Sequence, residues 1–248
     1  MYGSFMYCGK SIIAVVPARS GSKGLKNKNL LNLNGMNLIG WPIAAAIKSG
    51  ICDEIVCSTD SLEIAEVARS FGASTPFIRP KDLALDNTST SDVILHAIDY
   101  YEINGMTFDF ILLLEPTSPL TTSDDICAGF EILNKNSKGA ESLISVTENI
   151  SGHPDFTFNL EKDSNLLRSI NSEKWIHKRR QDVNKCYYID GTLYISKVKT
   201  FKQNKSFIHE QTIGMVVPKW KSFEIDEELD LTIIDSIMKS GRYGNYEK

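Results

Sequence analysis

Short apolar runs alternate with amphipathic segments along the first two-thirds of this chain, and this alternation limits the folds that it can adopt. Strands are expected where the apolar runs lie, over residues 11–17, 54–60, 108–114 and 141–146. Helices are expected between and after them, over residues 38–48, 61–71, 89–101 and 123–134, the last capped by Ser123. Such alternation is typical of an α/β protein with a parallel sheet. The loops after Val16, Ser58 and Leu114 should therefore open on one edge of the sheet.

Residues 148–195 lack this alternation and are interpreted as an inserted lobe within a single domain, residues 1–248. Gly152, Pro154 and several aromatic residues begin the segment, and an Asn/Ser/Lys-rich passage follows over residues 161–178. The chain is expected to return to the sheet over residues 212–218 and to close with a helix over residues 227–238. A chain of 248 residues is long enough to bury one large core of this kind.

A glycine-rich, cationic loop follows the first expected strand. Gly21 and Gly24 allow positive-φ backbone geometry with amide hydrogens pointing inward, and four cations lie within ten residues: Arg19, Lys23, Lys26 and Lys28. Open α/β sheets bind ligands at the carboxyl ends of their strands, which favours a triphosphate cradle over a merely solvated basic loop. Neither a Gly-x-x-x-x-Gly-Lys-Ser/Thr run nor a Gly-x-Gly-x-x-Gly run is present there, so P-loop hydrolysis and dinucleotide binding are disfavoured.

Composition restricts the classes of partner and compartment. The formal net charge is −4, which disfavours a general nucleic-acid surface. The five cysteines are odd in number and show no Cys-x-x-Cys pair, so they are interpreted as reduced thiols. No apolar run approaches the roughly 18 residues that a membrane span requires, and the N-terminal residues do not resemble a secretory leader. A cytoplasmic protein without a membrane or nucleic-acid partner is expected.

Motifs that occur in a fixed order connect the chain to a known family. They are residues 17–24 with Lys28 and Asn29, residues 83–86 with Thr88 and His96, residues 115–120, residues 179–182, Asp190 and Gly191 before Tyr194, and residues 224–226. Together they resemble the acylneuraminate cytidylyltransferases, which are the CMP-sialic acid synthetases and the related enzymes for legionaminic and pseudaminic acids. The resemblance implies a Rossmann-like nucleotide-diphospho-sugar transferase fold with helices on both faces of a mostly parallel sheet. It also implies that residues 148–195 form a dimerisation lobe of a homodimer.

The resemblance assigns roles to the residues of these motifs. Arg19 and Lys23 would grip the phosphates of CTP as catalytic residues, and Lys28 would lie nearer the α-phosphate. The remaining nucleotide contacts would come from Ala18, Ser20, Gly21, Gly24, Asn29, Ser89 and Ser91. For the two serines at 89 and 91, helix capping is the commoner role of such residues. The acidic sugar would be bound by Glu115, Thr117, Ser118, Arg179, Arg180, Gln181, Asp190 and Gly191.

Glu224 and Asp226 are the expected metal ligands. Their i, i+2 spacing places both carboxylates on one side of an extended segment, and Mg²⁺ prefers a few such oxygen ligands together with phosphate and water. The family usually has Asp at the first of these positions, so direct and water-mediated binding by Glu224 both remain open. The alternative is an acidic stretch that only favours the start of the following helix.

Two further departures from the family concern the sugar. Many relatives have Gln where this chain has Glu115 and Arg where it has Thr121. A carboxylate accepts hydrogen bonds from amino-sugar substituents, which makes a legionaminic or pseudaminic acid a serious contender beside N-acetylneuraminic acid. The predicted activity is the transfer of CMP from CTP to a nine-carbon acidic sugar with release of pyrophosphate. The alternatives are transfer to an eight-carbon keto-deoxy sugar, a uridylyl or guanylyl transferase, and a CTP-binding module without catalysis.

Overall fold

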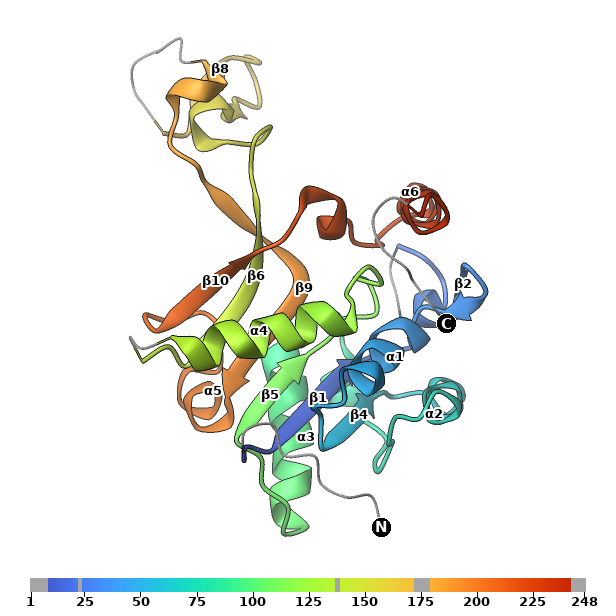
Figure 1. Ribbon diagram of the computed structural model, residues 1–248. Coiled ribbons are helices and arrows are strands. Elements are labelled where there is room, and N and C mark those ends of the chain that lie inside the picture. The colour runs from blue at the N-terminus through green and yellow to red at the C-terminus, as the bar shows by residue number, and fades with distance from the viewer. Residues whose placement is uncertain (1–8, 22–23, 137–138, 172–178, 242–248) are drawn as a thin grey trace.

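A computed structural model describes residues 9–21, 24–136, 139–171 and 179–241, and a six-stranded sheet forms its centre (Figure 1). The strands are β1 (Ile12–Pro17), β4 (Glu54–Ser58), β5 (Phe110–Leu113), β6 (Ser142–Glu148), β9 (Tyr187–Lys197) and β10 (Thr212–Val216). Their order is β10-β6-β9-β5-β1-β4. Strand β1 pairs parallel with β4 and β5, and β10 pairs parallel with β6, whereas β9 is antiparallel to both β5 and β6. The predicted α/β class with a mostly parallel sheet is confirmed.

Helices cover both faces of this sheet. They are α1 (Gly40–Ser49), α2 (Leu62–Ser70), α3 (Thr90–Ile103), α4 (Ser123–Lys135) and α5 (Val198–Asn204), whereas α6 (Glu228–Lys239) packs beside the sheet. Alternate side chains of β1 separate the two cores: Ile12 packs with α1, α2 and α4, and Ile13 packs with α3 and α5. In Figure 1, α1 and α4 accordingly lie in front of the sheet and α3 behind it. None of the described helices combines the length and apolar character that crossing a bilayer requires.

A third apolar cluster lies beside the sheet rather than on its faces. The short hairpin of β2 (Asn32–Leu33) and β3 (Met36–Asn37) packs with α6, and Ile225 is buried between them. Helix α6 therefore holds the segment before it, residues 224–226, against the body of the protein.

The cap expected for the helix after β5 is corrected by one residue. Thr122, not Ser123, is the N-cap of α4: its hydroxyl accepts a hydrogen bond from the Asp125 amide, and the Asp125 carboxylate accepts one from the Thr122 amide. This reciprocal capping box satisfies two amides that the helix itself leaves without partners. The neighbouring hydroxyl of Ser123 has no such role because Ser123 is the first residue of the helix.

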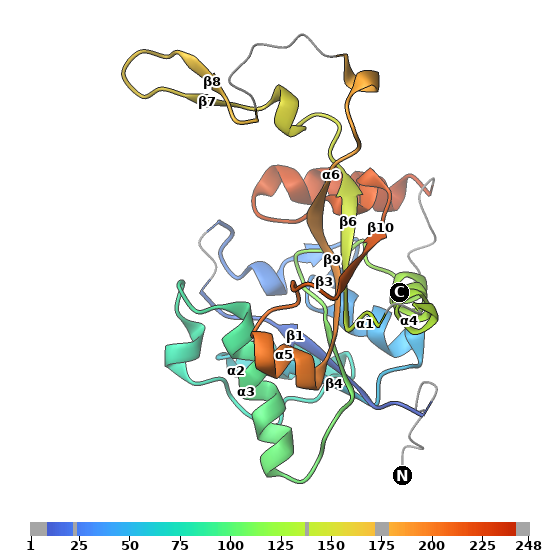
Figure 2. The same ribbon diagram turned by 90° about the vertical axis from the view of Figure 1, so that its left-hand side faces the viewer.

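The segment that leaves the sheet is shorter than residues 148–195. Strand β9 already begins at Tyr187 and lies between β5 and β6, so only residues 149–186 lie outside the sheet. They contain the turns η3 (Pro154–Phe156) and η4 (Arg180–Asp182) and an antiparallel hairpin of β7 (Phe158–Leu160) and β8 (Leu167–Ser169). Figure 2 shows this hairpin projecting away from the body of the protein. We call residues 149–186 the lobe.

Candidate functional site

Two adjoining pockets open at the carboxyl ends of β1 and β5, where the ligand is expected from the sequence. The first, of about 340 Å³, is lined by Pro17, Arg19, Gly24, Lys28, Asn29, Glu115, Pro116, Thr117 and Asp226. The second, of about 210 Å³, is lined by Pro17, Arg19, Arg79, Leu83, Leu85, Asp86, Thr88, Thr90, Val93 and Glu115. We call them the loop pocket and the Arg79 pocket. A larger hollow of about 560 Å³ lies between the β2–β3 hairpin and α6, but no expected site residue lines it.

The glycine-rich loop is docked against the segment that carries the expected metal ligands. The Lys28 ammonium donates to the carbonyl of Ile225 at 3.0 Å and pairs with Asp226 Oδ1 at 3.1 Å. A Cβ on Gly24 would lie only 2.3 Å from the carbonyl oxygen of Asp226, so no other residue fits there without a backbone shift. Two segments about 200 residues apart in the chain thus form one wall of the loop pocket.

The glycines of this loop act differently from the expectation. Neither Gly21 nor Gly24 has a positive φ; the left-handed residue is Asn27, with φ 53°. Gly24 is required by its close approach to Asp226 instead. Asn29 is 6% exposed and lines the pocket, and its amide donates to the carbonyl of Arg19 at 2.9 Å, which ties the two ends of the loop together.

Two acidic residues that were not among the expected site residues hold the start of the loop. Arg19 pairs with Asp86 at 2.6 Å. The amide and hydroxyl of Ser20 donate to the carboxylate of Asp60 at 2.8 and 2.7 Å. Burial opposes the ionisation of Asp60, but these hydrogen bonds outweigh it and keep its pKa below the ordinary value. Nothing in the local sequence around residue 60 marks Asp60 as a partner of the loop, and Asp86 lies in the motif of residues 83–86 but has no assigned role there.

Arg79 is a further site residue that sequence patterns do not reveal. Its side chain is nearly fully buried, with the residue 4% exposed, and burial lowers its pKa. Nε donates to Ser58 Oγ at 3.1 Å, and the terminal nitrogens contact the carbonyls of Ser58 and Leu83. The guanidinium is thereby fixed as a rigid wall of the Arg79 pocket. Charged groups are buried in this way only when the surrounding structure holds them with hydrogen bonds.

Ser89 and Ser91 stand at the start of the helix that borders the Arg79 pocket. Ser89 is the N-cap of α3: its hydroxyl accepts a hydrogen bond from the Asp92 amide at 3.1 Å and donates to the Asp92 carboxylate at 2.7 Å. Thr90, between the two serines, lines the pocket, whereas neither serine does. Ala18 is buried directly before the loop, and Lys23 lies outside the described residues.

Carboxylates from three separate elements gather beside the loop pocket. Burial raises the pKa of Glu115, the positive Lys28 lowers it, and Asp226 adds to the increase. Burial also raises the pKa of Glu224 to about 7, with further contributions from the negative charges of Glu115, Asp226 and Asp190. Like charges therefore face one another across this part of the site.

Asp190 and Gly191, within the first half of β9, complete this acidic region. Asp190 is 1% exposed; its Oδ1 accepts hydrogen bonds from the Ser145 hydroxyl at 2.5 Å and the Thr192 amide at 3.0 Å. Its Oδ2 and the buried hydroxyl of Ser118 have no hydrogen-bond partner within the described part of the chain. Gly191 has φ +75°, and a Cβ there would lie 2.1 Å from Glu224 Oε1 and 3.1 Å from Ser118 Oγ. Ser118, Gly191 and Glu224 thus converge on one small region.

The arginines of the lobe are not brought to these pockets by their own chain. The Arg179 guanidinium pairs with Asp182 at 2.7 Å, and Arg179 and Gln181 are exposed in the lobe. Neither residue lines either pocket. The Arg180 side chain lies outside the described part of the structure.

Comparisons of sequence identify the relatives of this chain. Residues 13–232 match the family model described as cytidylyltransferase. The chain is 37% identical over 233 residues to the CMP-N,N′-diacetyllegionaminic acid synthase of Legionella pneumophila. This alignment covers 92% of this chain and 96% of that protein. It is 29% identical over 231 residues to the pseudaminic acid cytidylyltransferase of Campylobacter jejuni, with coverage of 92% and 96%. It is 30% identical over 228 residues to the N-acylneuraminate cytidylyltransferase of Escherichia coli, with coverage of 92% and 52%.

Solved structures agree with the fold. A CMP:2-keto-3-deoxy-manno-octonic acid synthetase complexed with CTP superposes with a TM-score of 0.66 at 15% identity, covering 93% of this chain and 99% of that one. The 4-diphosphocytidyl-2C-methyl-D-erythritol synthase of Anaerococcus prevotii gives 0.63 at 13% identity, with the same coverage. At such identities the likeness shows the fold, and it confirms the expected nucleotidyltransferase architecture.

Proposed function

This chain belongs to the cytidylyltransferase family, and we propose that it transfers CMP from CTP to a nonulosonic acid, a nine-carbon acidic sugar, with release of pyrophosphate. The observation that carries this proposal is the 37% identity, over almost the whole chain, to a CMP-N,N′-diacetyllegionaminic acid synthase. The two adjoining pockets support it, because Arg19 and Lys28 line the larger one and the fixed guanidinium of Arg79 lines the smaller one.

We assign the nucleotide to both pockets. The Arg79 pocket suits the cytosine ring, because fixed side chains and neighbouring backbone carbonyls there provide directional hydrogen-bonding groups. The triphosphate then lies along Arg19 and Lys28 in the loop pocket, which shares Pro17, Arg19 and Glu115 with the Arg79 pocket. The charge of Lys28 stabilises the negative charge that develops on the α-phosphate as the reaction proceeds.

The sugar is assigned to the acidic region formed by Glu115, Ser118, Asp190, Gly191 and Glu224. Its anomeric hydroxyl oxygen forms a bond to the α-phosphorus while the bond from that phosphorus to the bridging oxygen breaks. Pyrophosphate leaves, and the hydroxyl proton passes to solvent. Within the described residues, Asp190 Oδ2 and the Ser118 hydroxyl have no hydrogen-bond partner, and this supports contact with sugar hydroxyl or N–H groups.

We propose that Glu224 and Asp226 hold Mg²⁺. The described residues contain no group of three or more His, Cys, Asp or Glu side chains that would hold a metal without the substrate. Two carboxylates are nevertheless a fitting set for Mg²⁺, which takes its remaining ligands from phosphate and water. Burial is the main cause of the raised Glu224 pKa, and the repulsion from Glu115, Asp226 and Asp190 that adds to it is relieved by a cation. When bound, the ion would polarise the α-phosphoryl group.

The Mg²⁺ requirement is expected to depend on pH near neutrality. Protonated Glu224 does not bind a cation, and the Glu224 pKa is raised to about 7 in the metal-free protein. The Mg²⁺ concentration for half-maximal activity should therefore rise as pH falls through about 7, by about tenfold for each pH unit once Glu224 is mostly protonated. Initial rates at pH 6 to 8 over a range of Mg²⁺ concentrations measure this. A requirement that is constant from pH 8 to pH 6 contradicts the assignment of Glu224.

We propose that the lobe joins two copies of this chain into a homodimer. The hairpin carries exposed apolar side chains, namely Phe158, Leu160, Leu166, Leu167 and Ile170. A second copy would cover them and would bring its own Arg179 and Arg180 toward the sugar region, where guanidinium groups suit a sugar carboxylate. We also place the enzyme in the cytoplasm, in keeping with cysteines 52, 57, 127 and 186, which are free.

Replacing Leu160 by aspartate should dissociate this dimer. Loss of a buried apolar anchor typically costs about 2 kcal/mol or more, which weakens association roughly 30-fold. Analytical ultracentrifugation measures the change, and the KM for the sugar should rise while binding of CTP is kept. Leu62→Asp is the matched control, since Leu62 is similarly exposed but lies on α2 of the body. A wild-type protein that sediments as a monomer contradicts the proposal.

A panel of sugars tests the proposed function directly. The enzyme is mixed with CTP, Mg²⁺ and one of four acids: N,N′-diacetyllegionaminic, pseudaminic, N-acetylneuraminic or 3-deoxy-manno-octulosonic acid. Pyrophosphate release together with a CMP conjugate is expected with a nine-carbon acid. A conjugate formed only with the eight-carbon acid assigns the chain to that alternative, and binding of CTP without pyrophosphate release identifies a non-catalytic module.

A further inference from the structure

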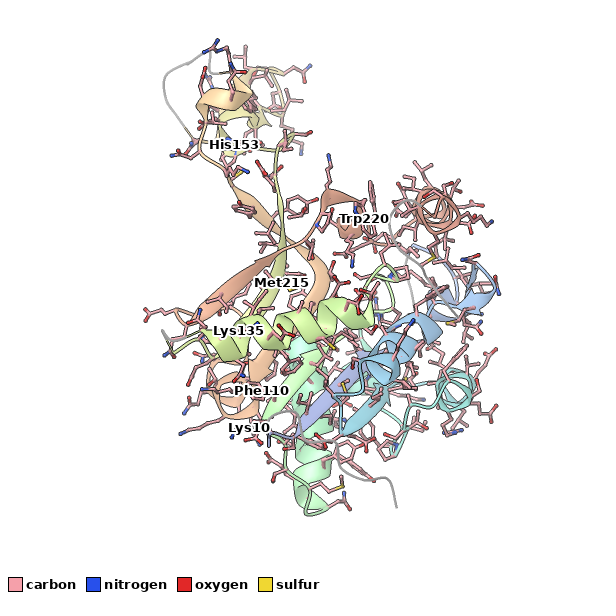
Figure 3. All side chains as sticks on the ribbon, in the orientation of Figure 1. Lys10, Phe110, Lys135, His153, Met215 and Trp220 are labelled. Atoms are coloured by element: carbon pink, nitrogen blue, oxygen red, sulfur yellow. The ribbon has the colours of Figure 1, made fainter. Side chains whose placement is uncertain are left out.

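The segment from residue 217 to residue 226, which we call the strap, crosses the carboxyl edge of the sheet and carries Glu224 and Asp226. It is attached at both ends by backbone hydrogen bonds. At one end the Val217 amide donates a hydrogen bond to the carbonyl of Val146 at 2.9 Å. At the other end the Ile225 amide donates one to the carbonyl of Thr117 at 2.8 Å. Figure 3 shows Trp220 of the strap between the sheet and α6. The position of the two carboxylates therefore depends on how the strap is held between its ends.

A buried ion pair holds the middle of the strap. Lys221 is 8% exposed, and its ammonium contacts Asp125 Oδ2 and lies 3.3 Å from Thr122 Oγ1. The Asp125 side chain is almost as buried, and its carboxylate also accepts the hydrogen bond from the Thr122 amide in the capping box. The carbonyl of Lys221 accepts a hydrogen bond from Thr192 at 3.4 Å. Lys221 is thus fixed both to the start of α4 and to β9.

This anchor lies outside the substrate pockets but close to the groups that act there. Neither Lys221 nor Asp125 lines the loop pocket or the Arg79 pocket. Glu224, three residues after Lys221, meets Gly191, and Asp226 meets Gly24 and Lys28. These contacts leave little room, since an added Cβ at either glycine would clash. A shift of the strap therefore displaces both carboxylates relative to the phosphates.

We propose that Lys221 and Asp125 are positioning residues that set the place of Glu224 and Asp226 for the reaction. A buried charge whose partner is lost is strongly unfavourable, so the pair resists separation and keeps the strap in one position. This inference rests on the proposed function for its kinetic consequence. Its structural consequence, an ordered strap, is measured independently.

Lys221→Met tests the proposal by three measurements. Hydrogen exchange of the Ile225 amide should be about tenfold faster or more, because the strap opens locally. Titration with Mn²⁺ in the presence of CTP, followed by the electron paramagnetic resonance of free Mn²⁺, should require about tenfold more ion. The kcat should fall by about 10²-fold, as is common when reacting groups are misplaced by an ångström. Asp125→Asn retains a capping oxygen and should change the exchange rate, the Mn²⁺ requirement and kcat in the same directions. It replaces Lys221→Met as the test if that variant folds poorly.

Lys197→Met is the control variant, because Lys197 also pairs with a carboxylate, Glu141 at 3.1 Å, but at the opposite edge of the sheet. It should leave the exchange of Ile225 and the Mn²⁺ titration within about twofold of the wild type. If Lys221→Met exchanges and binds Mn²⁺ like the wild type, the positioning role is wrong. If the wild type forms no CMP conjugate, the proposed function fails, while the exchange measurement still decides whether the pair orders the strap.

Discussion

The Lys28→Ala variant is expected to lose about 10²-fold to 10³-fold in kcat, the usual effect of removing one preorganised charge contact. Lys28 is the described cation that faces both the strap and the loop pocket, through contacts with Ile225 and Asp226. Its loss also leaves Glu115 and Glu224 without the positive charge that lowers their pKa values. Steady-state rates of pyrophosphate release at saturating CTP and sugar measure the effect.

The matched control for Lys28 is Lys10→Ala. Lys10 also pairs with an aspartate at 3.1 Å, Asp109, but on the opposite side of the sheet. Figure 3 places Lys10 near Phe110, far from Trp220 of the strap. This variant should retain the wild-type kcat, since an exposed pair contributes little. A Lys28→Ala enzyme with wild-type turnover overturns the assignment of the loop pocket to the triphosphate.

The Gly191→Ala variant is expected to abolish detectable turnover and to lower the free energy of unfolding by about 1–3 kcal/mol. Two effects act together. The residue has φ +75°, where a side chain is strained, and the new methyl carbon would lie 2.1 Å from Glu224 Oε1. The clash moves the Glu224 carboxylate away from Ser118 and Asp190. Denaturant unfolding and the pyrophosphate assay measure the two consequences separately.

Gly105→Ala separates backbone strain from the clash. Gly105 has φ +79°, but a Cβ there meets nothing within 4 Å, and the residue lies beyond the end of α3. This variant should lose about 1 kcal/mol of stability through strain and retain full turnover. If Gly191→Ala and Gly105→Ala behave alike in both measurements, Glu224 does not depend on the space that Gly191 leaves.

Much of the fold was predictable, because the pattern of apolar residues along a segment indicates which of its faces are buried. The runs that became β1 and β5 are apolar throughout since both faces of these strands are covered by helices. The end of β1 followed by a cationic loop was enough to locate the loop pocket. The capping box of α4 was also present in the sequence, since Asp125 stands three residues after Thr122. The adjacent Ser123 is an equally suitable N-cap residue, and it was chosen instead.

Strand β9 shows where local pattern fails. Its first residues, Tyr187 and Tyr188, are exposed and resemble the irregular lobe before them. They pair with Glu148 and Thr147 of β6, about 40 residues earlier, and only this pairing makes them part of the sheet. The pairing of β9 depends on β5 and β6, the two strands between which it lies in the sheet. No window of the sequence contains that information.

The amino-acid sequence alone determined the α/β class, the cationic loop at the end of the first strand and the carboxylate pair of Glu224 and Asp226, because each depends on neighbouring residues. The tertiary structure decided which distant groups meet. It buried Arg79 against Ser58, set Asp190 and Glu115 close to Glu224, and fastened the strap through Lys221 to Asp125. The physical reason is that burial and electrostatic coupling depend on separation in space, which adjacency in the chain does not record.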